Sequence, residues 1–176
     1  MLSSGKTVGV EMPSKVFYSF HHSSDEWRAS QVQNIGTVER NKLASDKDWD
    51  AIKNGGDYAI QSWIDSQLAG CACAIVLIGQ NTANRKWIDY EITKAWSDRK
   101  GLMGIYIHNL KDSSGNPSSK GENPFDGFTV GVNKKVLSSL VNAYDPPYAD
   151  SSRVYEYISQ NLENWIEKAI ETRNSF

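Results

Sequence analysis

Trp87 and Glu91 are the two side chains of this sequence whose types and spacing could carry out chemistry. They are four residues apart, and in a helix this spacing puts both side chains on one face, one turn apart. A carboxylate beside an indole can hold a cationic aromatic substrate, because the ring stacks and the acid stabilises positive charge. The spacing alone also fits the commoner arrangement, in which Trp87 packs in the core and Glu91 is solvated.

The apolar pattern predicts the strands and helices that must position this pair. Short aromatic, β-branched or wholly apolar runs indicate strands, and apolar residues at helical spacing indicate helices. Gly55-Gly56 marks the start of one helix and Gly70 its end. The strands are expected at residues 15–20, 41–45, 71–79 and 101–110, with an edge strand at 136–141. The helices are expected at residues 23–33, 56–68, 84–99 and 151–170.

Strands that alternate with helices predict an α/β fold, with a mostly parallel sheet of about five strands and helices on both faces. We expect a single domain over residues 15–176, preceded by a flexible lead-in at residues 1–14. In such sheets ligands bind outside the carboxyl ends of the strands. Those ends are expected at Phe20-His21-His22, Ser45-Asp46, Gly79-Gln80-Asn81 and His108-Asn109.

Three common sites of open α/β sheets are not indicated. The first strand is followed by SFHHSSDE, which lacks the glycines of a dinucleotide fingerprint and of a flavodoxin phosphate loop. The third strand ends in Gly79-Gln80, where a phosphoacceptor receiver needs an aspartate. These patterns disfavour a redox dinucleotide enzyme and a phosphorelay protein.

The amino-acid composition limits the kinds of ligand and partner that this protein can have. The 176 residues carry a formal net charge of -2, which disfavours a nucleic-acid backbone as ligand but permits a nucleotide. No apolar run is long enough to span a membrane. Cys71 and Cys73 lie in an apolar stretch, so we expect buried thiols in a reducing compartment, the cytoplasm. Three histidines without ligand spacing argue against a metal site.

Several other polar residues could be functional or could be ordinary surface residues. His21-His22 could contact phosphate or ribose or act as an acid, or they could form the polar edge of a loop. Arg85 and Lys86 near a helix start suit a phosphate, although ordinary surface charges are favoured. Asp46, Asp48 and Asp50 could suit Mg²⁺, although a solvated acidic turn is favoured. Trp49 and Trp63 are expected to pack in the core. The polar loop at 111–128 is long enough for a functional role to be considered, and no role is assigned to His108.

Three stretches together resemble the Toll/interleukin-1-receptor (TIR) family over roughly residues 15–110. KVFYSFHHSSDE is similar to the first box of the family, and NRKWIDYEI is similar to its Trp-Cys-x-x-Glu helix start, with Ile88 in place of the cysteine. Between them, GGDYAIQSWIDSQLAGCACAIVLIGQ resembles the stretch from a glycine-bearing loop into the central strand. Asp46-Lys47-Asp48-Trp49 and the NPFDGF loop look closest to the TIR-like proteins of Thoeris anti-phage defence.

The resemblance implies a flavodoxin-like fold and an enzyme that cleaves NAD at the nicotinamide–ribose bond. In the Thoeris-like members it further implies cyclisation of the ADP-ribose into a signalling nucleotide. The catalytic glutamate of the family corresponds to Glu91 and its pocket tryptophan to Trp87. The residues that border the nicotinamide correspond to Ser19, Phe20 and His21. NAD is then the substrate and not a cofactor, and no metal is required.

The alternative is a non-catalytic TIR interaction module. Glu91 and Trp87 are expected of an enzyme and unnecessary for a scaffold. A third class, a flavodoxin-like binder of a small ligand, is disfavoured by the missing phosphate loop. For the enzyme, the resemblance implies self-association, a phage-derived trigger and a separate effector that reads the product.

Overall fold

A computed structural model describes residues 15–36, 38 and 46–176, with the side chains of residues 46–48 left out. A four-stranded parallel sheet has the order β1-β2-β3-β6. The strands are β1 (Val16–Ser19), β2 (Cys73–Ile78), β3 (Gly101–Tyr106) and β6 (Ala143–Tyr144). The α/β class is confirmed, and the strand expected at 41–45 falls outside the described residues.

The edge strand predicted at residues 136–141 is wrong. Lys135–Val136 forms β5, which pairs antiparallel with β4 (Thr129–Val130) in a separate hairpin. The chain then turns through a short 3₁₀ helix, η2 (Leu137–Ser139), because Leu137 is buried and the Ser139 hydroxyl donates to the Val136 carbonyl. The edge position of the main sheet goes to β6 instead.

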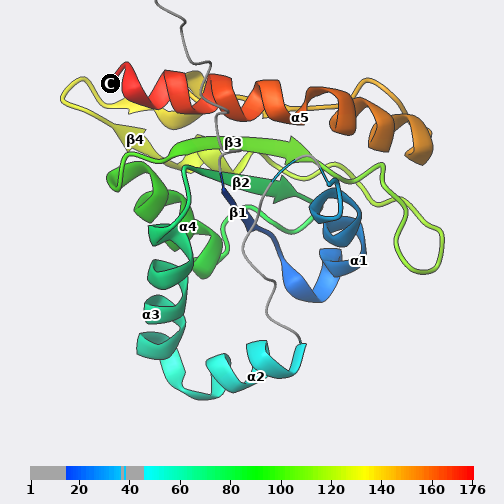
Figure 1. Ribbon diagram of the computed structural model, residues 1–176, viewed down its shortest axis with the longest axis horizontal. Helices are drawn as coiled ribbons and strands as arrows, with labels where there is room; N and C mark the ends of the chain where they lie inside the picture. The colour runs from blue at the N-terminus through cyan, green and yellow to red at the C-terminus, as the bar shows by residue number, and fades with distance from the viewer. Residues whose placement is uncertain (1–14, 37, 39–45) are drawn as a thin grey trace, which may run out of the picture.

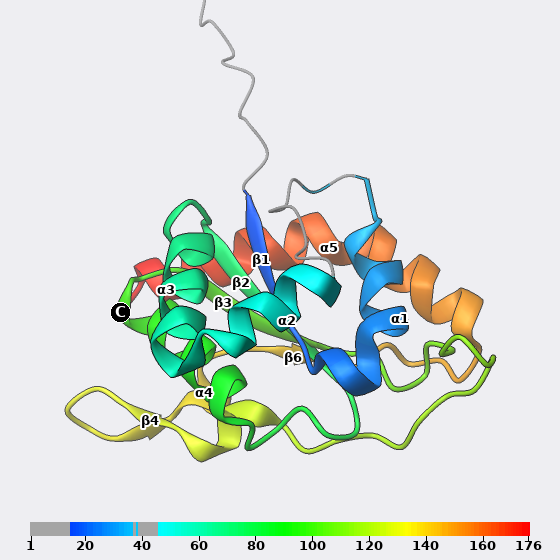
Figure 2. The ribbon, with the colours of Figure 1, turned by 90° about the horizontal axis from the view of Figure 1, so that it is seen from below.

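Helices cover both faces of the sheet (Figure 1). α1 (His22–Gln33) and α5 (Ser151–Asn174) share one apolar core with the sheet, and α3 (Gly56–Ala69) and α4 (Lys86–Ser97) share the other. α2 (Asp46–Asn54) packs on α3 and lies between α3 and α1 when the molecule is seen from below (Figure 2). The four predicted helices are therefore confirmed, and α2 was not predicted.

The ends of the elements differ from expectation by a few residues. α3 begins at Gly56, whose φ of 79° suits glycine, and Gly70 is its C-cap, as expected. α4 begins at Lys86 and not at Asn84, because Asn84 has a φ of 64° and lies outside helical backbone space. β3 ends at Tyr106, four residues earlier than predicted.

The polar loop at 111–128 contains a short 3₁₀ helix, η1 (Pro124–Gly127). Asn123 caps it, since its side-chain oxygen accepts from the Phe125 backbone N–H at 2.9 Å. The Phe125 side chain is fully buried in the core with α3 and α4. Within the described part of the chain, no helix is long and apolar enough to cross a membrane.

Candidate active site

A cavity of about 620 Å³ opens at the carboxyl end of β1, between the starts of α1 and α4 and the short helix α2. This is the edge at which open α/β sheets bind ligands. Its volume is in the range of small-molecule sites. The lining residues come from three segments: Phe20, His21, His22, Ser23 and Glu26; Trp49, Asp50 and Lys53; Arg85, Lys86, Trp87, Ile88 and Glu91.

Glu91 is the least accessible ionisable group of this cavity among the described residues, with 7% of its surface exposed. Its Oε2 accepts a hydrogen bond from the Ser19 hydroxyl. Burial raises the pKa of Glu91 to about 8, and the Ser19 hydrogen bond acts in the opposite direction. At neutral pH the Glu91 carboxyl is therefore mostly protonated, and a nearby cation would favour its ionisation.

Trp87 lines the same cavity as Glu91, so the sequence-based expectation of a shared face is met. Its ring is half-buried, contacts Tyr90 edge to face at 5.9 Å and lies 4.8 Å below the Lys86 Nζ. Ile88, which replaces the cysteine of the TIR motif, is largely buried in the apolar core at the edge of the cavity. The site therefore combines a carboxyl and an indole on one helical face.

A column of three rings lines the cavity beside β1. Phe20 and His22 have ring centroids 4.2 Å apart, and His22 stacks on Trp49 at 4.8 Å with an interplanar angle of 15°. The role in packing that we expected for Trp49 is correct but incomplete, because Trp49 also contributes to the cavity. Trp63 packs behind it, with edge contacts to Trp49 and Phe17.

His21 lines the cavity, as expected, and is also the residue that precedes α1. Its Nδ1 is hydrogen-bonded to the Ser24 hydroxyl. Burial, with a further contribution from Arg85, lowers the pKa of His21, and Asp25 opposes the shift. A neutral imidazole at pH 7 suits hydrogen bonding to a ribose or phosphate better than acid catalysis.

Ser19 is the one expected site residue that the structure does not bring to the cavity. It is buried under Glu91 and absent from the cavity lining. Phe20, His21, Trp87 and Glu91 all line the cavity. The contact of Ser19 with Glu91 joins the first box of the sequence to the α4 motif, 72 residues away.

Cations gather at the start of α4. Arg85 precedes the helix, and its Nε donates to the Asn81 carbonyl at 3.0 Å. Lys86 forms an ion pair with Asp57. Neither the α1 nor the α4 N-terminus has a side-chain cap, so the first-turn N–H groups of α4 and the guanidinium of Arg85 together suit a phosphate. The surface-charge interpretation favoured from the sequence is thus incomplete, since both cations line the cavity.

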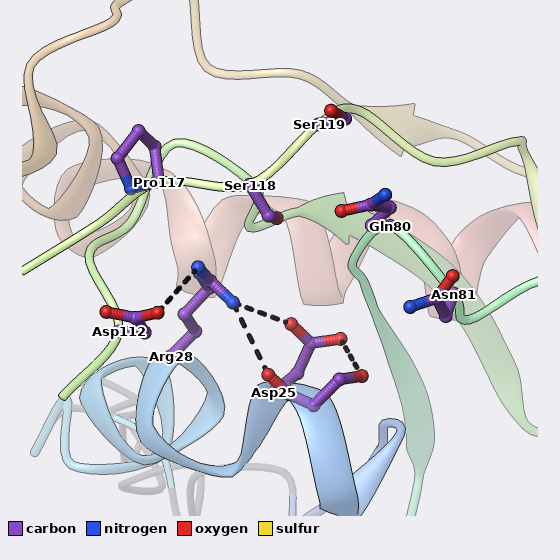
Figure 3. Close-up of a pocket in the computed structure, with 9 residues that line it drawn as sticks. Asp25, Arg28, Gln80, Asn81, Asp112, Pro117, Ser118 and Ser119 are labelled. Carbon is purple, nitrogen blue, oxygen red and sulfur yellow. Dashed lines mark hydrogen bonds and ion pairs between the residues drawn. The ribbon is translucent and has the colours of Figure 1, made fainter. Parts of the chain in front are cut away.

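A second, polar cavity of about 410 Å³ lies between α1, the end of β2 and the loop after β3 (Figure 3). Arg28 fills one wall, and its guanidinium donates to Asp25 Oδ1 at 3.2 Å and to the carbonyls of Leu110 and Asn116 at 2.8 and 2.9 Å. The Asp25 carboxyl lies against Gly79, so closely that a Cβ there would overlap it. Arg28 therefore links the loop after β3 to α1, and its guanidinium N–H groups already donate to protein acceptors.

We expect Arg28→Met to lower the free energy of unfolding by about 3 to 5 kcal/mol, because the change leaves buried Asp25 without its cation. Burial already raises the pKa of Asp25, so the loss should be smaller at pH 5, where the carboxyl is protonated more readily. Urea denaturation at pH 5 and pH 8 measures both effects. Arg153→Met, at an exposed arginine of α5, is the control, and an equal effect of the two variants would contradict the role of Arg28.

The described residues include no group of three or more His, Cys, Asp or Glu side chains that could hold a metal ion. The turn expected at Asp46, Asp48 and Asp50 is wrong, because these residues lie in α2, where Asp50 forms an ion pair with Lys53 at 3.2 Å. Cys71 and Cys73 are buried free thiols, as predicted. His108 is buried, with its Nδ1 unpartnered among the described residues, and it lines neither cavity.

The parallel sheet, its helices and the buried glutamate at its carboxyl edge define a flavodoxin-like domain of the TIR type. The chain belongs to the TIR-like family of Thoeris ThsB proteins, because the family described as "Thoeris protein ThsB, TIR-like domain" matches residues 17–112. Ser19, Phe20, His21, Trp87 and Glu91 all fall inside the matched stretch.

A relative of known description comes from Bacillus cereus (strain MSX-D12), where it is named "Putative cyclic ADP-D-ribose synthase ThsB1". It is 36% identical over 120 residues, which cover 65% of this chain. The aligned region spans 62% of the length of that relative.

Proposed function

We propose that this protein consumes NAD, cleaves its nicotinamide–ribose bond and cyclises the ADP-ribose into a signalling nucleotide. The observation that carries the proposal is the Glu91 carboxyl, buried at the cavity between the Trp87 indole and the first-box residues. A scaffold that works by surface contacts has no need of a buried carboxyl at a cavity of this kind.

Bond cleavage suits this environment. As the C1′–N bond breaks, the bonding electrons leave with nicotinamide, which becomes neutral, and positive charge spreads over the ribose as an oxocarbenium ion. A carboxylate close to the ribose stabilises that charge, more strongly where water is excluded. The pyridinium cation of NAD also favours ionisation of Glu91, whose pKa burial raises to about 8.

The second half of the reaction decides the product. If water attacks C1′, a proton is lost and linear ADP-ribose forms. If a hydroxyl of the same ADP-ribose attacks, the products are cyclic ADP-ribose, nicotinamide and a proton. A cavity that folds the substrate back on itself favours the internal nucleophile by proximity.

The cavity offers matching partners for the rest of NAD. The rings of Phe20, Trp49 and Trp87 suit the flat nicotinamide, and Arg85 with the start of α4 suits the diphosphate. These groups come from three segments of the chain, around Phe20, around Trp49 and at residues 85–87, which meet at the carboxyl edge of the sheet.

The test is mass-resolved chromatography of NAD incubated with the pure protein at high concentration, with and without phage lysate. Nicotinamide together with a product at the mass of cyclic ADP-ribose supports the proposal. If linear ADP-ribose is the only product, the result supports the active site but contradicts the proposed signalling role. No consumption of NAD under either condition rejects the enzyme and favours the interaction module.

Trp87→Ala is expected to raise KM for NAD by about 5- to 150-fold, since a stacked base contributes roughly 1 to 3 kcal/mol. The matched control is Trp96→Ala, which removes a tryptophan from the same helix at a distance from the cavity. Steady-state kinetics at pH 7.5 measure both variants. Equal KM values for Trp87→Ala and the wild type would show that the indole does not bind substrate.

We further propose a role in bacterial anti-phage immunity, based on the family and on the name of the Bacillus cereus relative. In this proposal the protein works in the cytoplasm, where reducing conditions suit the free thiols Cys71 and Cys73. Self-association and a phage-derived trigger activate it, and a separate effector reads the product. Nucleic acid and membranes are not partners.

A further inference from the structure

Ser19 occupies the last position of β1, on the side of the strand that faces α4. Val16 and Tyr18 belong to the apolar core with α1 and α5, whereas Phe17 belongs to the core with α3 and α4. Side chains alternate along a strand, so Ser19 points to the same side as Phe17. Its pairing with Val76 of β2 fixes that orientation.

The Ser19 hydroxyl donates to Oε2 of Glu91, and no other described residue hydrogen-bonds the Glu91 side chain. Ser19 is 2% exposed and does not line the cavity, whereas Glu91 does. The hydroxyl therefore lies behind the carboxyl, on the side away from any substrate. Contact with Oε2 leaves Oε1 available to the cavity.

We propose that Ser19 is a positioning residue, whose hydroxyl holds Oε2 of Glu91 so that Oε1 faces the substrate and the carboxyl can ionise in a buried site. The inference rests on the proposed function and deepens it. A hydroxyl suits this place because it donates to a carboxylate and accepts from a neutral carboxyl. The Ser19 hydroxyl can therefore hydrogen-bond Glu91 whether the carboxyl is charged or neutral. A methyl group could do neither, and an ammonium group can only donate.

Ser19→Ala should raise the pKa of Glu91 by about one unit, because the alanine methyl group cannot donate a hydrogen bond to the charged carboxylate. A smaller fraction of the NAD complex is then ionised at pH 7, and kcat should fall by up to about tenfold. KM should stay within about twofold, since Ser19 does not line the cavity. At pH 10 the variant should recover most of the wild-type rate.

The direct measurement is a ¹³C NMR titration of protein labelled at the glutamate side-chain carboxyl. The Glu91 signal is the one missing from Glu91→Gln. The expected result is an inflection near pH 8 in the wild type and a higher one in Ser19→Ala. An unchanged inflection in Ser19→Ala overturns the proposal, and so does a raised KM with unchanged kcat, which would make Ser19 a substrate contact.

Three further variants keep the test decisive. Ser159→Ala removes from α5 a buried hydroxyl that has no hydrogen-bond partner among the described residues, and it should leave both the Glu91 pKa and kcat unchanged. Ser19→Thr retains the hydroxyl and should restore the wild-type pKa. If Ser19→Ala fails to fold, Ser19→Cys, with its weak donor, should raise the pKa by a smaller amount, and no rise overturns the proposal.

Failure of the inference and failure of the proposed function give different results. A wild type that consumes no NAD removes the proposed function, and the catalytic role of Ser19 with it. An active Ser19→Ala variant with wild-type pH dependence removes only the role of Ser19.

Discussion

Glu91→Gln should lower the rate of NAD consumption by about a thousandfold, with little change in the fold. Glutamine has the same shape, and its side-chain oxygen can still accept from the Ser19 hydroxyl. What it lacks is negative charge beside the forming oxocarbenium ion. The expected loss is therefore in kcat, and it is measured as nicotinamide release in a single-turnover assay.

The control for this prediction is Glu163→Gln on the exposed face of α5, which makes the same chemical change far from the cavity. It should keep the wild-type rate. A Glu91→Gln variant with more than about a tenth of that rate would mean that another group stabilises the transition state, and the assignment of Glu91 would have to be abandoned.

The same substitution should make the protein more stable, and increasingly so as the pH rises. The pKa of Glu91 is about 8 when folded and 4.5 when unfolded, so between these values the folded state binds more protons. Stability from this group is therefore full below pH 4.5 and is lost as the pH rises to 8. Compared with its value below pH 4.5, the free energy of unfolding is lower by roughly 3 kcal/mol at pH 7 and by roughly 5 kcal/mol above pH 8.

Glutamine cannot ionise and escapes this cost. Urea denaturation of Glu91→Gln and the wild type at pH 5, 7 and 9 should show a difference that is small at pH 5 and largest at pH 9. Glu163→Gln should stay within about 0.5 kcal/mol of the wild type at every pH, as an exposed substitution does. A stability difference for Glu91→Gln that does not grow with pH would show that the carboxyl is solvated in the folded protein.

Much of this architecture is predictable from the sequence, since the strong patterns lie in its buried elements. The run from Cys71 to Gly79 is apolar throughout because β2 is covered on both faces. The spacing of Trp87 and Glu91 correctly predicts a shared helical face, but it cannot distinguish a cavity from solvent. Only the tertiary structure shows that Glu91 is buried.

The features that the sequence did not predict depend on contacts between distant segments. Trp49 lies on a short helix and becomes a cavity residue only by stacking on His22. Residues 135–136 have strand character, yet they pair in a local hairpin and not in the main sheet. Ser19 alternates like any strand residue, and nothing in its own neighbourhood indicates that its partner is Glu91.

The close packing of the Asp25 carboxyl on Gly79 has a consequence for how this sequence can change. A side chain at position 79 would displace a carboxylate that is ion-paired to Arg28, and the loop bound by that arginine would lose its attachment. Asp25 and Gly79 are therefore expected to be kept or exchanged together in evolution, although 54 residues separate them. Any chimera that takes α1 from one protein of this family and the end of β2 from another must transfer the acid and the glycine together.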